Sequence, residues 1–187
     1  MKMRLDDDDK TAEFEAIVLP HLDAAYNLAR WLTRNDHDAE DLVQMAFMRA
    51  FRFFGGFRGG DARAWLLTIV RNTFYTTLRD GRHAQDEIPF DEETHSRIGD
   101  GDDRSVYGLG TNPENVLASE DARKAVNQAL ERLPQSFREV VVLKEMDDLS
   151  YKEIAEIAGI PIGTVMSRLA RGRKLLVEYL KHHAIGG

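Results

Sequence analysis

The sequence contains no cysteine and no long hydrophobic run. Without cysteine, the chain cannot form a disulfide-stabilised scaffold, a thiol nucleophile or a cysteine-ligated zinc or iron–sulfur site. Its uninterrupted apolar runs, such as Val140–Leu143, are at most four residues long, whereas a membrane-spanning helix needs about 20. No basic segment followed by an apolar one opens the chain, so we see no secretory signal. These absences predict a soluble, cytoplasmic protein.

Basic side chains are in the minority, because 25 Lys and Arg face 32 Asp and Glu among 187 residues, for a net charge of −7. This balance argues against nucleic-acid binding, since attraction to phosphates supplies much of that affinity. The charge is uneven, however. Residues 81–121 carry 3 basic and 11 acidic side chains, whereas residues 122–187 carry 11 basic and 8 acidic ones. The C-terminal part alone therefore has the charge expected of a DNA-binding domain.

The first twelve residues are mainly a charge run. Within them, Asp6–Lys10 matches an enterokinase cleavage site, which either vector-derived residues or coincidence would explain. We expect residues 1–12 to be a flexible N-terminus.

Residues 13–80 show helical periodicity and are predicted to form the first of two helical domains. Asp38 is expected to cap a helix, with Asp41 completing a capping box. The expected buried stripe of that helix is Ala39, Leu42, Val43, Ala46, Phe47, Ala50 and Phe54. Four glycines between Gly55 and Gly60 end it, and Asp61 caps the next helix. The expected buried stripe of this second helix is Trp65, Leu66, Ile69, Val70, Thr73 and Thr77.

Residues 81–112 lose this periodicity and are rich in Asp, Glu, Gly and Ser, with few apolar anchors. Such a composition cannot offset the entropy of ordering the chain. We predict a flexible acidic linker, with an ordered surface loop as the alternative.

Residues 113–183 are predicted to form the second helical domain. Asn112 and Pro113 are typical of a helix start, Pro134 ends that helix, and Ser150 with Glu153 predicts a capping box. No strand signal appears. We therefore predict an all-α fold of two small helical domains joined by the flexible acidic linker.

Two short helices in the second domain match a helix-turn-helix. The first spans about Ser150–Ile157, and the second starts near Pro161 after a turn containing Gly159. A helical wheel of the second helix places on its apolar side Ile162, Val165, Met166, Leu169 and Leu176. The opposite side carries Thr164, Ser167, Arg168, Arg171 and Lys174. Hydroxyls and long cations suit base edges and phosphates in the major groove.

The alternative for this helix is an ordinary amphipathic helix whose basic face is solvated. The turn, the capping box and the Gly163–Val165 entry favour DNA binding. Arg173 falls toward the apolar side, which suits a packing or phosphate role.

The first domain carries a second candidate surface, on the helix after Asp61. The face opposite its buried stripe carries Thr68, Arg71, Asn72, Tyr75 and Arg79. Cations beside an aromatic ring and an amide suit single-stranded or melted nucleic acid, although a solvated polar face explains them equally well. The exposed face of the preceding helix carries Asp41, Gln44, Met48 and Arg52. An exposed Met48 among polar neighbours is consistent with protein docking, although single exposed apolar residues are common.

An acidic cluster raises the alternative of a metal-dependent hydrolase. Its members are Asp36, Asp38, Glu40 and Asp41. They do not share one helix face, and no second helix supplies a matching Glu-x-x-His pair. We predict no enzymatic activity, no metal and no cofactor.

The motifs at both ends of the chain, taken together, resemble those of a known family. The N-terminal motifs are Asp38–Gln44, Ala64–Leu66 and Ile69–Asn72; the C-terminal ones are Leu133–Pro134, Arg138, Ser150–Ala155 and Gly163–Arg173. In this order they closely resemble the extracytoplasmic-function group of bacterial sigma factors, over residues 13–80 and 114–180. The resemblance implies an initiation factor that binds core RNA polymerase and directs it to promoter DNA, without catalytic chemistry of its own. Family members are commonly held inactive by an anti-sigma factor until a stress signal arrives.

The resemblance also implies roles for individual residues. Contacts with the clamp helices of the largest polymerase subunit would involve Asp38, Asp41, Gln44 and Met48. Recognition and melting of the −10 element would involve Gly55, Arg58, Thr68, Arg71, Asn72, Tyr75 and Arg79. Recognition of the −35 element would involve Thr164, Ser167, Arg168, Arg171 and Lys174, in a domain that also docks on the flap of the second-largest subunit.

Two positions depart from the family pattern. The family often has Lys at the position of Met166 and Glu at that of Met45. The missing cation at 166 puts one expected phosphate contact in doubt, but not the fold. The alternative function is an autonomous helix-turn-helix regulator that binds DNA without polymerase. The basic patch in the C-terminal part of this chain is small for such a regulator. We therefore expect the pure protein to bind DNA weakly.

Overall fold

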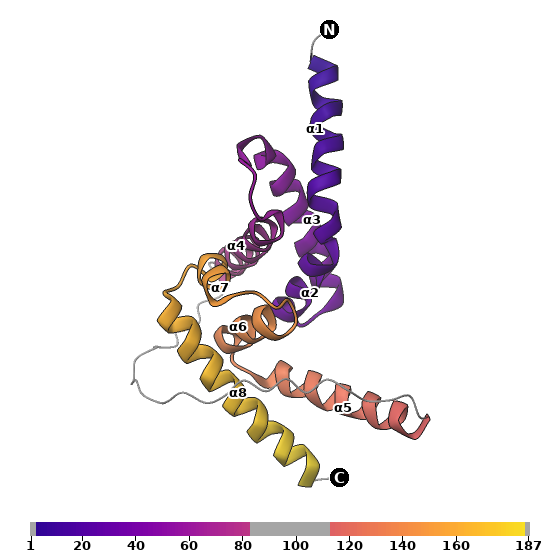
Figure 1. Cartoon of the computed structure of the whole chain (residues 1–187), viewed down its shortest axis with the longest axis vertical. Helices are drawn as coiled ribbons and strands as arrows, with labels where there is room; N and C mark the ends of the chain where they lie inside the picture. The colour runs from indigo at the N-terminus through magenta and orange to yellow at the C-terminus, as the bar shows by residue number, and fades with distance from the viewer. Residues whose placement is uncertain (1–2, 83–112, 186–187) are drawn as a thin grey trace.

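The structure is a computed structural model that describes residues 3–82 and 113–185 (Figure 1). These residues form helices and short loops, without a β-strand, as the all-α prediction requires. The acidic linker expected over residues 81–112 lies outside the described residues, apart from 81 and 82, which end a helix. In the described segments, no helix is long and apolar enough to cross a membrane.

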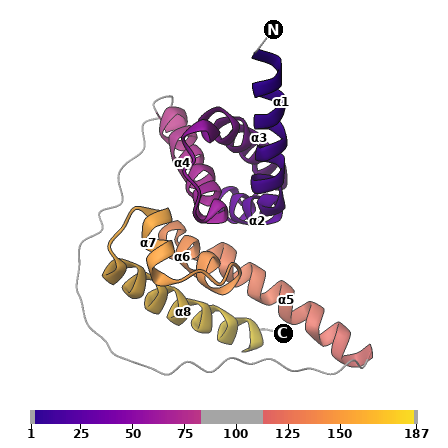
Figure 2. The ribbon, with the colours of Figure 1, turned by 45° about the horizontal axis from the view of Figure 1, so that its top comes forward.

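The N-terminal domain consists of four helices, α1 to α4. Their bounds are Met3–Val18 for α1, Leu22–Thr33 for α2, Asp36–Phe53 for α3 and Ala62–Arg82 for α4. Short 3₁₀ turns join α1 to α2 (η1, Leu19–His21) and follow α3 (η2, Phe54–Gly56). Helices α2, α3 and α4 pack on one another, and α1 extends away from them (Figures 1 and 2).

The N-terminus differs from the prediction, because α1 begins at Met3 rather than after a flexible segment. Its C-terminal half is anchored by aromatic contacts. Phe14 is buried and meets the rings of Phe47, Phe51 and Phe54 edge-on, with centroids 6.2, 5.2 and 5.3 Å away. The ammonium group of Lys10 lies 4.7 Å from the ring centroid of Phe51, a cation–π contact. These contacts hold residue 10 in a helix that the charge run alone does not predict.

Helix α3 begins two residues before the predicted N-cap. Asn35 caps it, since the Asn35 side chain accepts a hydrogen bond from the backbone N–H of Asp38 at 3.1 Å. Arg34 adopts the left-handed conformation that ends α2 (φ 58°), and this fixes where the next helix starts. The predicted stripe of α3 does face the core, with Phe47 only half-buried. Asp61 caps α4 as predicted, accepting from the N–H of Ala64 at 3.0 Å.

The C-terminal domain also has four helices in the described residues. They are α5 (Pro113–Arg132), α6 (Gln135–Glu145), α7 (Tyr151–Ala158) and α8 (Ile162–Ile185). The predicted capping box is present: the Glu153 carboxylate accepts from the Ser150 N–H at 2.7 Å, and Ser150 Oγ accepts from the Glu153 N–H at 3.2 Å. Gly159 ends α7 at a φ of 65°, which favours glycine. Helices α7 and α8 form the predicted helix-turn-helix.

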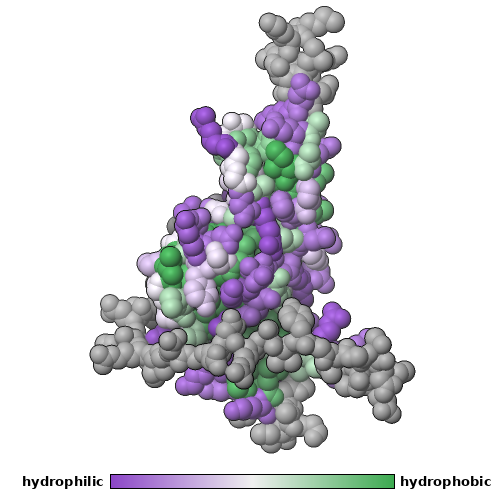
Figure 3. Space-filling model, viewed as in Figure 1, coloured by the Kyte–Doolittle hydropathy of each residue, from purple (hydrophilic) through white to green (hydrophobic). Residues whose placement is uncertain are grey.

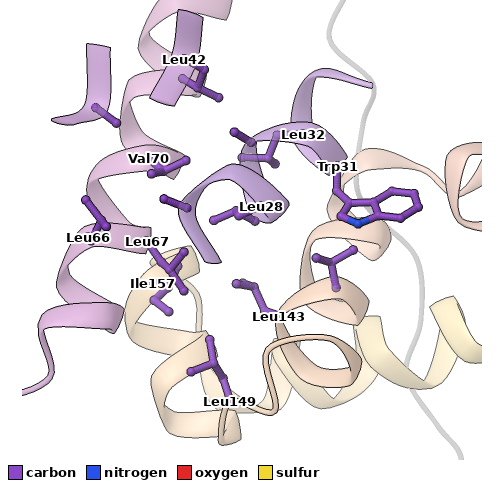
Figure 4. Close-up of a cluster of buried hydrophobic side chains, with 14 of the residues drawn as sticks. Leu28, Trp31, Leu32, Leu42, Leu66, Leu67, Val70, Leu143, Leu149 and Ile157 are labelled. Carbon is purple, nitrogen blue, oxygen red and sulfur yellow. The ribbon is translucent and has the colours of Figure 1, made fainter. Parts of the chain in front are cut away.

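The two domains pack against each other, which the sequence did not predict. Helix α2 contacts α6 and α4 contacts α7, and one hydrophobic cluster runs through both domains. Figure 4 shows Leu67 of α4 beside Ile157 of α7, and Leu28 of α2 above Leu143 of α6. Leu67 lies outside the predicted stripe of α4 but is fully buried, because it faces the second domain.

Candidate nucleic-acid interface

Helix α8 is the recognition helix of the helix-turn-helix. Val165 and Leu169 are buried and hold it against the rest of the domain. Of the five predicted −35 residues, Ser167, Arg171 and Lys174 are exposed, whereas Thr164 and Arg168 are half-buried. The Ser167 hydroxyl donates to the backbone carbonyl of Thr164 at 3.1 Å. The exposed residues form a polar surface with a hydroxyl and two cations, which is suited to major-groove contacts.

Two apolar residues of α8 are more exposed than the helical wheel predicts. Ile162 is 47% exposed and Met166 is 53% exposed, although both were assigned to the buried side. At about 100° per residue, Ile162 lies about 20° and Met166 about 60° from Leu169, so both belong to the apolar side of the wheel. Both nevertheless remain about half exposed, whereas Val165 and Leu169 are buried. The outer surface of α8 therefore has an apolar edge beside its polar residues.

Gly172 lies at a close contact between α8 and α6. It is the one described glycine at which an added Cβ atom would meet another residue within 4 Å. A Cβ atom at this position would stand 2.7 Å from Cγ2 of Val141 and 3.5 Å from Cβ of Phe137. Only glycine allows this approach without a shift of α6. The close packing explains a glycine in the middle of a helix, where it otherwise lowers stability.

Arg173, which the helical wheel placed toward the apolar side, is exposed and forms an ion pair. Its Nε and Nη2 atoms donate to Oε1 of Glu145 at 2.9 and 2.6 Å, joining α8 to the end of α6. The hydrogen bond to Glu145 raises the pKa of Arg173. This ion pair lies within the C-terminal domain.

The predicted −10 face of α4 is only partly exposed. Asn72 and Arg79 are exposed, and Thr68 is half-buried with its hydroxyl donating to the carbonyl of Ala64 at 2.8 Å. Arg71 and Tyr75, by contrast, both contact one carboxylate of the second domain. These two residues therefore do not face solvent freely in this structure.

That carboxylate belongs to Glu139 of α6, which is 2% exposed. Nε of Arg71 donates to Oε1 of Glu139, and the Tyr75 hydroxyl donates to Oε2 at 3.1 Å. The Arg71 guanidinium lies 4.5 Å from the ring centroid of Tyr75. Burial, with the Glu139 charge, raises the pKa of Tyr75 to about 12, against the opposing charges of Arg71 and Arg168. A buried carboxylate needs such partners, because an unpaired one is costly.

A second ion pair crosses the interface between the domains. Nη2 of Arg63 lies 2.8 Å from Oδ1 of Asp147, which is 5% exposed. Burial raises the pKa of Asp147, and the hydrogen bond from Arg63 opposes this shift. Asp147 follows α6 in the turn that leads to the helix-turn-helix.

A third contact joins the end of α2 to the end of α5. Arg34 donates to the backbone carbonyl of Glu131 at 3.2 Å, and Arg138 donates to the same carbonyl at 3.2 Å. The Arg30 guanidinium lies 3.7 Å from the Glu131 carboxylate. Arg138, which the family motif includes, is 3% exposed; burial, with the nearby charge of Arg34, lowers its pKa to about 10.

The ion pairs described across this interface share one polarity. The cations come from the N-terminal domain and are Arg30, Arg63 and Arg71. The acids come from the C-terminal domain and are Glu131, Glu139 and Asp147. Sequence reasoning missed these acids as functional residues, because their partners lie in the other domain. One feature of the sequence could have indicated a special role for Glu139, because this charged residue directly precedes the apolar run Val140–Leu143.

The loop before α4 is held by aromatic stacking. Phe54 is buried and stacks on Phe57, with ring centroids 6.0 Å apart, and Phe57 lies 5.0 Å from Trp65. Trp65, predicted to belong to the buried stripe, is half-buried: its ring packs against the core and against Phe57 of this loop. Gly55 and Arg58 are exposed on the loop. The aromatic contacts therefore fix the position from which Arg58 projects.

The outer face of α3 carries the predicted polymerase-binding residues. Asp38, Asp41 and Gln44 are exposed, and Met48 is 73% exposed. Their spacing of three and four residues places them on one stripe. Met45 and Phe53 on the same helix are also exposed, and Figure 3 shows hydrophobic surface beside α1, bordered by hydrophilic side chains. Among the residues that the structure describes, no group of three or more His, Asp or Glu could hold a metal ion, so the acidic cluster near Asp38 does not form such a site.

A helix-turn-helix with an exposed polar recognition helix, packed on a second helical domain, places the protein in the class of helical DNA-binding proteins. Comparison with known families defines it further. Residues 17–84 match the family described as Sigma-70 region 2, and residues 123–176 match Sigma-70, region 4. The chain is 37% identical over 142 residues to the ECF RNA polymerase sigma-E factor of Escherichia coli K12, covering 74% of this chain and 72% of that protein. The chain belongs to the family of extracytoplasmic-function (ECF) RNA polymerase sigma factors.

Other similarities agree with this assignment. The ECF RNA polymerase sigma factor SigE of Mycolicibacterium smegmatis is 36% identical over 172 residues, or 91% of this chain; the chain spans only 63% of the length of that relative. Sigma factor RpoE of Bartonella quintana, solved with the anti-sigma factor NepR, superimposes with a TM-score of 0.66 at 32% identity, covering 90% of this chain and 97% of that one. CnrH, solved with the cytosolic domain of CnrY, shares the fold, with a TM-score of 0.60 at 24% identity over 92% of this chain and 90% of that one.

Family membership decides between the predicted functions. Sigma factors are transcription initiation factors that bind core RNA polymerase and promoter DNA and are not enzymes. The autonomous regulator is not favoured, because a match to Sigma-70 region 2 adds a domain that such a regulator does not need.

Proposed function

We propose that this chain acts in the cytoplasm by holding core RNA polymerase through α3 while it contacts the −10 element through α4 and its preceding loop and the −35 element through α8. The observation that carries this proposal is the presence of both sigma regions in one chain, with the polar side of the recognition helix exposed.

The polymerase contact is supported by the exposed stripe on α3. Asp41, Gln44 and Met48 lie along one side of the helix, away from its buried stripe. Methionine is enriched at protein-binding surfaces, where its flexible side chain adapts to a partner, and the 73% exposed Met48 is available for such a contact. We propose that Asp38 extends this surface toward the start of α3.

The −35 contact is supported by the polar surface of α8. Arg171 and Lys174 are one turn apart and exposed, and Ser167 lies one turn before Arg171. This arrangement lets cations reach phosphates or guanine edges while a hydroxyl reaches a neighbouring base. Thr164 and Arg168 would complete the contact at the start of the helix.

The −10 contact is supported by Arg58 on the aromatic-anchored loop and by the face of α4. Exposed Asn72 and Arg79 are accessible in this structure, whereas Arg71 and Tyr75 hold Glu139. An aromatic ring, an amide and cations on one helix suit unstacked bases and their phosphates. Full use of this face requires that α6 move away from α4.

Control by an anti-sigma factor is supported by one of the similar structures. The Bartonella quintana sigma factor, 32% identical over 90% of this chain, was solved with an anti-sigma factor. We propose that a protein inhibitor likewise binds this chain and prevents its assembly with core polymerase.

Transcription in vitro tests the proposal. Bacterial core RNA polymerase is combined with the purified chain and a library of promoter-containing templates, and start sites are mapped. We expect new, discrete start sites that core enzyme alone does not produce. Start-site choice identical to that of core enzyme on every template would overturn the proposal.

A mobility-shift assay on a template selected in this way separates the proposal from the autonomous regulator. We expect the pure chain to bind weakly at physiological salt and the complex with core to bind tightly. Tight binding by the pure chain, unchanged by core enzyme, would favour the regulator instead.

A further inference from the structure

The contact of Glu139 with Arg71 and Tyr75 has the features of an occupied anion site. Two donors, the Arg71 guanidinium and the Tyr75 hydroxyl, converge on one carboxylate. A cation–π contact of 4.5 Å holds these two donors together. The carboxylate is nearly inaccessible to solvent. Arginine binds carboxylate and phosphate oxygens with the same geometry.

We propose that Arg71 and Tyr75 form one anion site with two alternative occupants: the Glu139 carboxylate when the two domains are packed together, and a phosphate of single-stranded promoter DNA when they separate. The inference rests on the proposed function, because that function assigns the −10 contact to this face of α4. It adds that the C-terminal domain of the chain blocks its own DNA site.

The charge pattern of the interface supports this exchange. Arg63 is held by Asp147 as Arg71 is held by Glu139, so cations of the N-terminal domain meet acids of the C-terminal domain at both places. A surface whose arginines bind acidic side chains is also complementary to a polyanion. The acids of α6 and of the turn after it occupy positions that phosphates would take.

The dimensions of a promoter require the domains to separate. Elements named −35 and −10 lie about 25 base pairs apart, or on the order of 85 Å of B-DNA at about 3.4 Å per base pair. A domain of about 65 residues has a radius of gyration of about 11 Å, so two packed domains cannot reach both elements. The 30 residues between Arg82 and Pro113 can extend to about 100 Å, so the covalent connection permits separation.

The first experiment measures the separation of the domains in the full chain. Because the chain has no cysteine, Glu40→Cys on α3 and Glu178→Cys on α8, both exposed positions, allow two dyes to be attached for energy transfer. We expect Glu139→Gln to shift the distance distribution toward longer values. The matched control is Glu145→Gln, which removes the same charge from the same helix but breaks only the contact with Arg173 inside the C-terminal domain.

The second experiment measures occupancy of the anion site by DNA. The probe is fluorescein-labelled single-stranded oligodeoxythymidylate, since phosphate contacts do not depend on base sequence. We expect Glu139→Gln to bind the probe tighter than the unmodified chain by at least about threefold, because a closed fraction lowers apparent affinity in proportion. Glu145→Gln should bind like the unmodified chain, and adding Arg71→Gln to Glu139→Gln should abolish the gain.

A second variant keeps the test decisive if Glu139→Gln does not fold. Arg63→Gln removes the cation from the buried Asp147 carboxylate and leaves Arg71 and Tyr75 intact, and a buried charge without its partner destabilises the packed state. It should also lengthen the dye distance and, through the freed Arg71, tighten binding of the probe. Unchanged dye distance and unchanged probe affinity in whichever of these variants folds would overturn the inference.

The transcription assay separates failure of the inference from failure of the proposed function. If the unmodified chain directs initiation but opening variants gain no probe affinity, the shared anion site is wrong and the sigma function stands. If the unmodified chain directs no initiation on any template, the proposed function is wrong, whatever the dye distances show.

Discussion

Nη2 of Arg63 in α4 lies 2.8 Å from Oδ1 of Asp147, a residue 84 positions later in the chain. The second carboxylate oxygen, Oδ2, is buried and has no hydrogen-bond partner among the described residues. One arginine therefore compensates only part of the cost of burying this carboxylate. The interface between the domains is consequently sensitive to the protonation of Asp147.

The first prediction concerns pH. Burial raises the pKa of Asp147 above the ordinary value of 3.8, so the folded chain binds this proton more tightly than the unfolded chain. The free energy of unfolding therefore contains a contribution that is fully present below about pH 3.8 and is lost as the pH rises through the raised pKa. We expect Asp147→Asn to remove this contribution, which urea unfolding over a range of acidic pH values would measure.

The control for this prediction is the adjacent residue. Asp148 has a side chain that is 99% exposed, and its φ of 50° is one that asparagine tolerates well. Asp148→Asn should leave the pH dependence of the unmodified chain unchanged. Equal pH profiles for Asp147→Asn and the unmodified chain would show that Asp147 titrates normally.

The second prediction concerns the ionisation of Tyr75. Its pKa is raised to about 12 by burial and by Glu139, with Arg71 and Arg168 acting in the opposite direction. Spectrophotometric titration of the five tyrosines should therefore show one group that ionises late. Glu139→Gln removes the negative charge and weakens the packing of Tyr75 against α6. We therefore expect the pKa of Tyr75 to fall toward its ordinary value of 10 in this variant.

Tyr75→Phe identifies the late step in that titration. The variant should lose it and keep the others. If the late step persists in Tyr75→Phe, it belongs to another tyrosine, and the environment assigned to Tyr75 is wrong.

Features that depend on near neighbours were predictable from the sequence. The Ser150–Glu153 capping box, the Asp61 cap and the Gly159 turn each depend on residues within a few positions of one another, and all three are present. The N-cap of α3 was predicted three residues late, at Asp38 instead of Asn35, because Asn35, Asp36 and Asp38 are all good caps. Only the left-handed Arg34, which ends α2, selects among them.

Features that depend on the other domain could not be predicted. Leu67 is buried because α7 covers it, and Glu139 is buried because Arg71 and Tyr75 hold it from 68 and 64 positions away. Periodicity within one helix carries no information on such contacts. The polar face of α4 could thus be named from the sequence, but its occupation by Glu139 could not.

The third prediction concerns packing between α6 and α8. A methyl group added at Gly172 would stand 2.7 Å from Val141 Cγ2, and valine in a helix has little freedom to rotate away. We expect Gly172→Ala to destabilise the chain by roughly 1 kcal/mol, since overpacking costs about 1–3 kcal/mol and the gain in helix propensity is about 1 kcal/mol. Thermal or urea unfolding would measure this.

Gly163→Ala is the matched control in the same helix. No atom lies within 4 Å of a Cβ built at Gly163, so only the gain in helix propensity applies. This variant should be as stable as the unmodified chain or slightly more stable. A stabilising Gly172→Ala would show that α6 and α8 are not in close contact at that position.

The fourth prediction uses the exposed apolar edge of the recognition helix. Met166 is 53% exposed and follows directly after the buried Val165. It lies near the N-terminal end of α8, just after the turn of the helix-turn-helix. A lysine here would stand beside the residues proposed to contact the −35 element and could reach a phosphate. Each added phosphate contact steepens the dependence of log affinity on log salt concentration by about 0.9 on duplex DNA. We expect Met166→Lys to produce this change in the binding of the polymerase complex to promoter DNA.

Val177→Lys distinguishes a new contact from a general effect of charge. Val177 is 50% exposed on the same helix, but it lies 11 residues further on, about 16 Å along the axis at 1.5 Å per residue. Both variants change the net charge of the chain equally, so a general electrostatic effect would steepen the two salt dependences alike. A steeper slope for Met166→Lys alone places residue 166 against the DNA backbone, whereas a slope equal to that of the unmodified chain would place this edge of α8 away from the duplex.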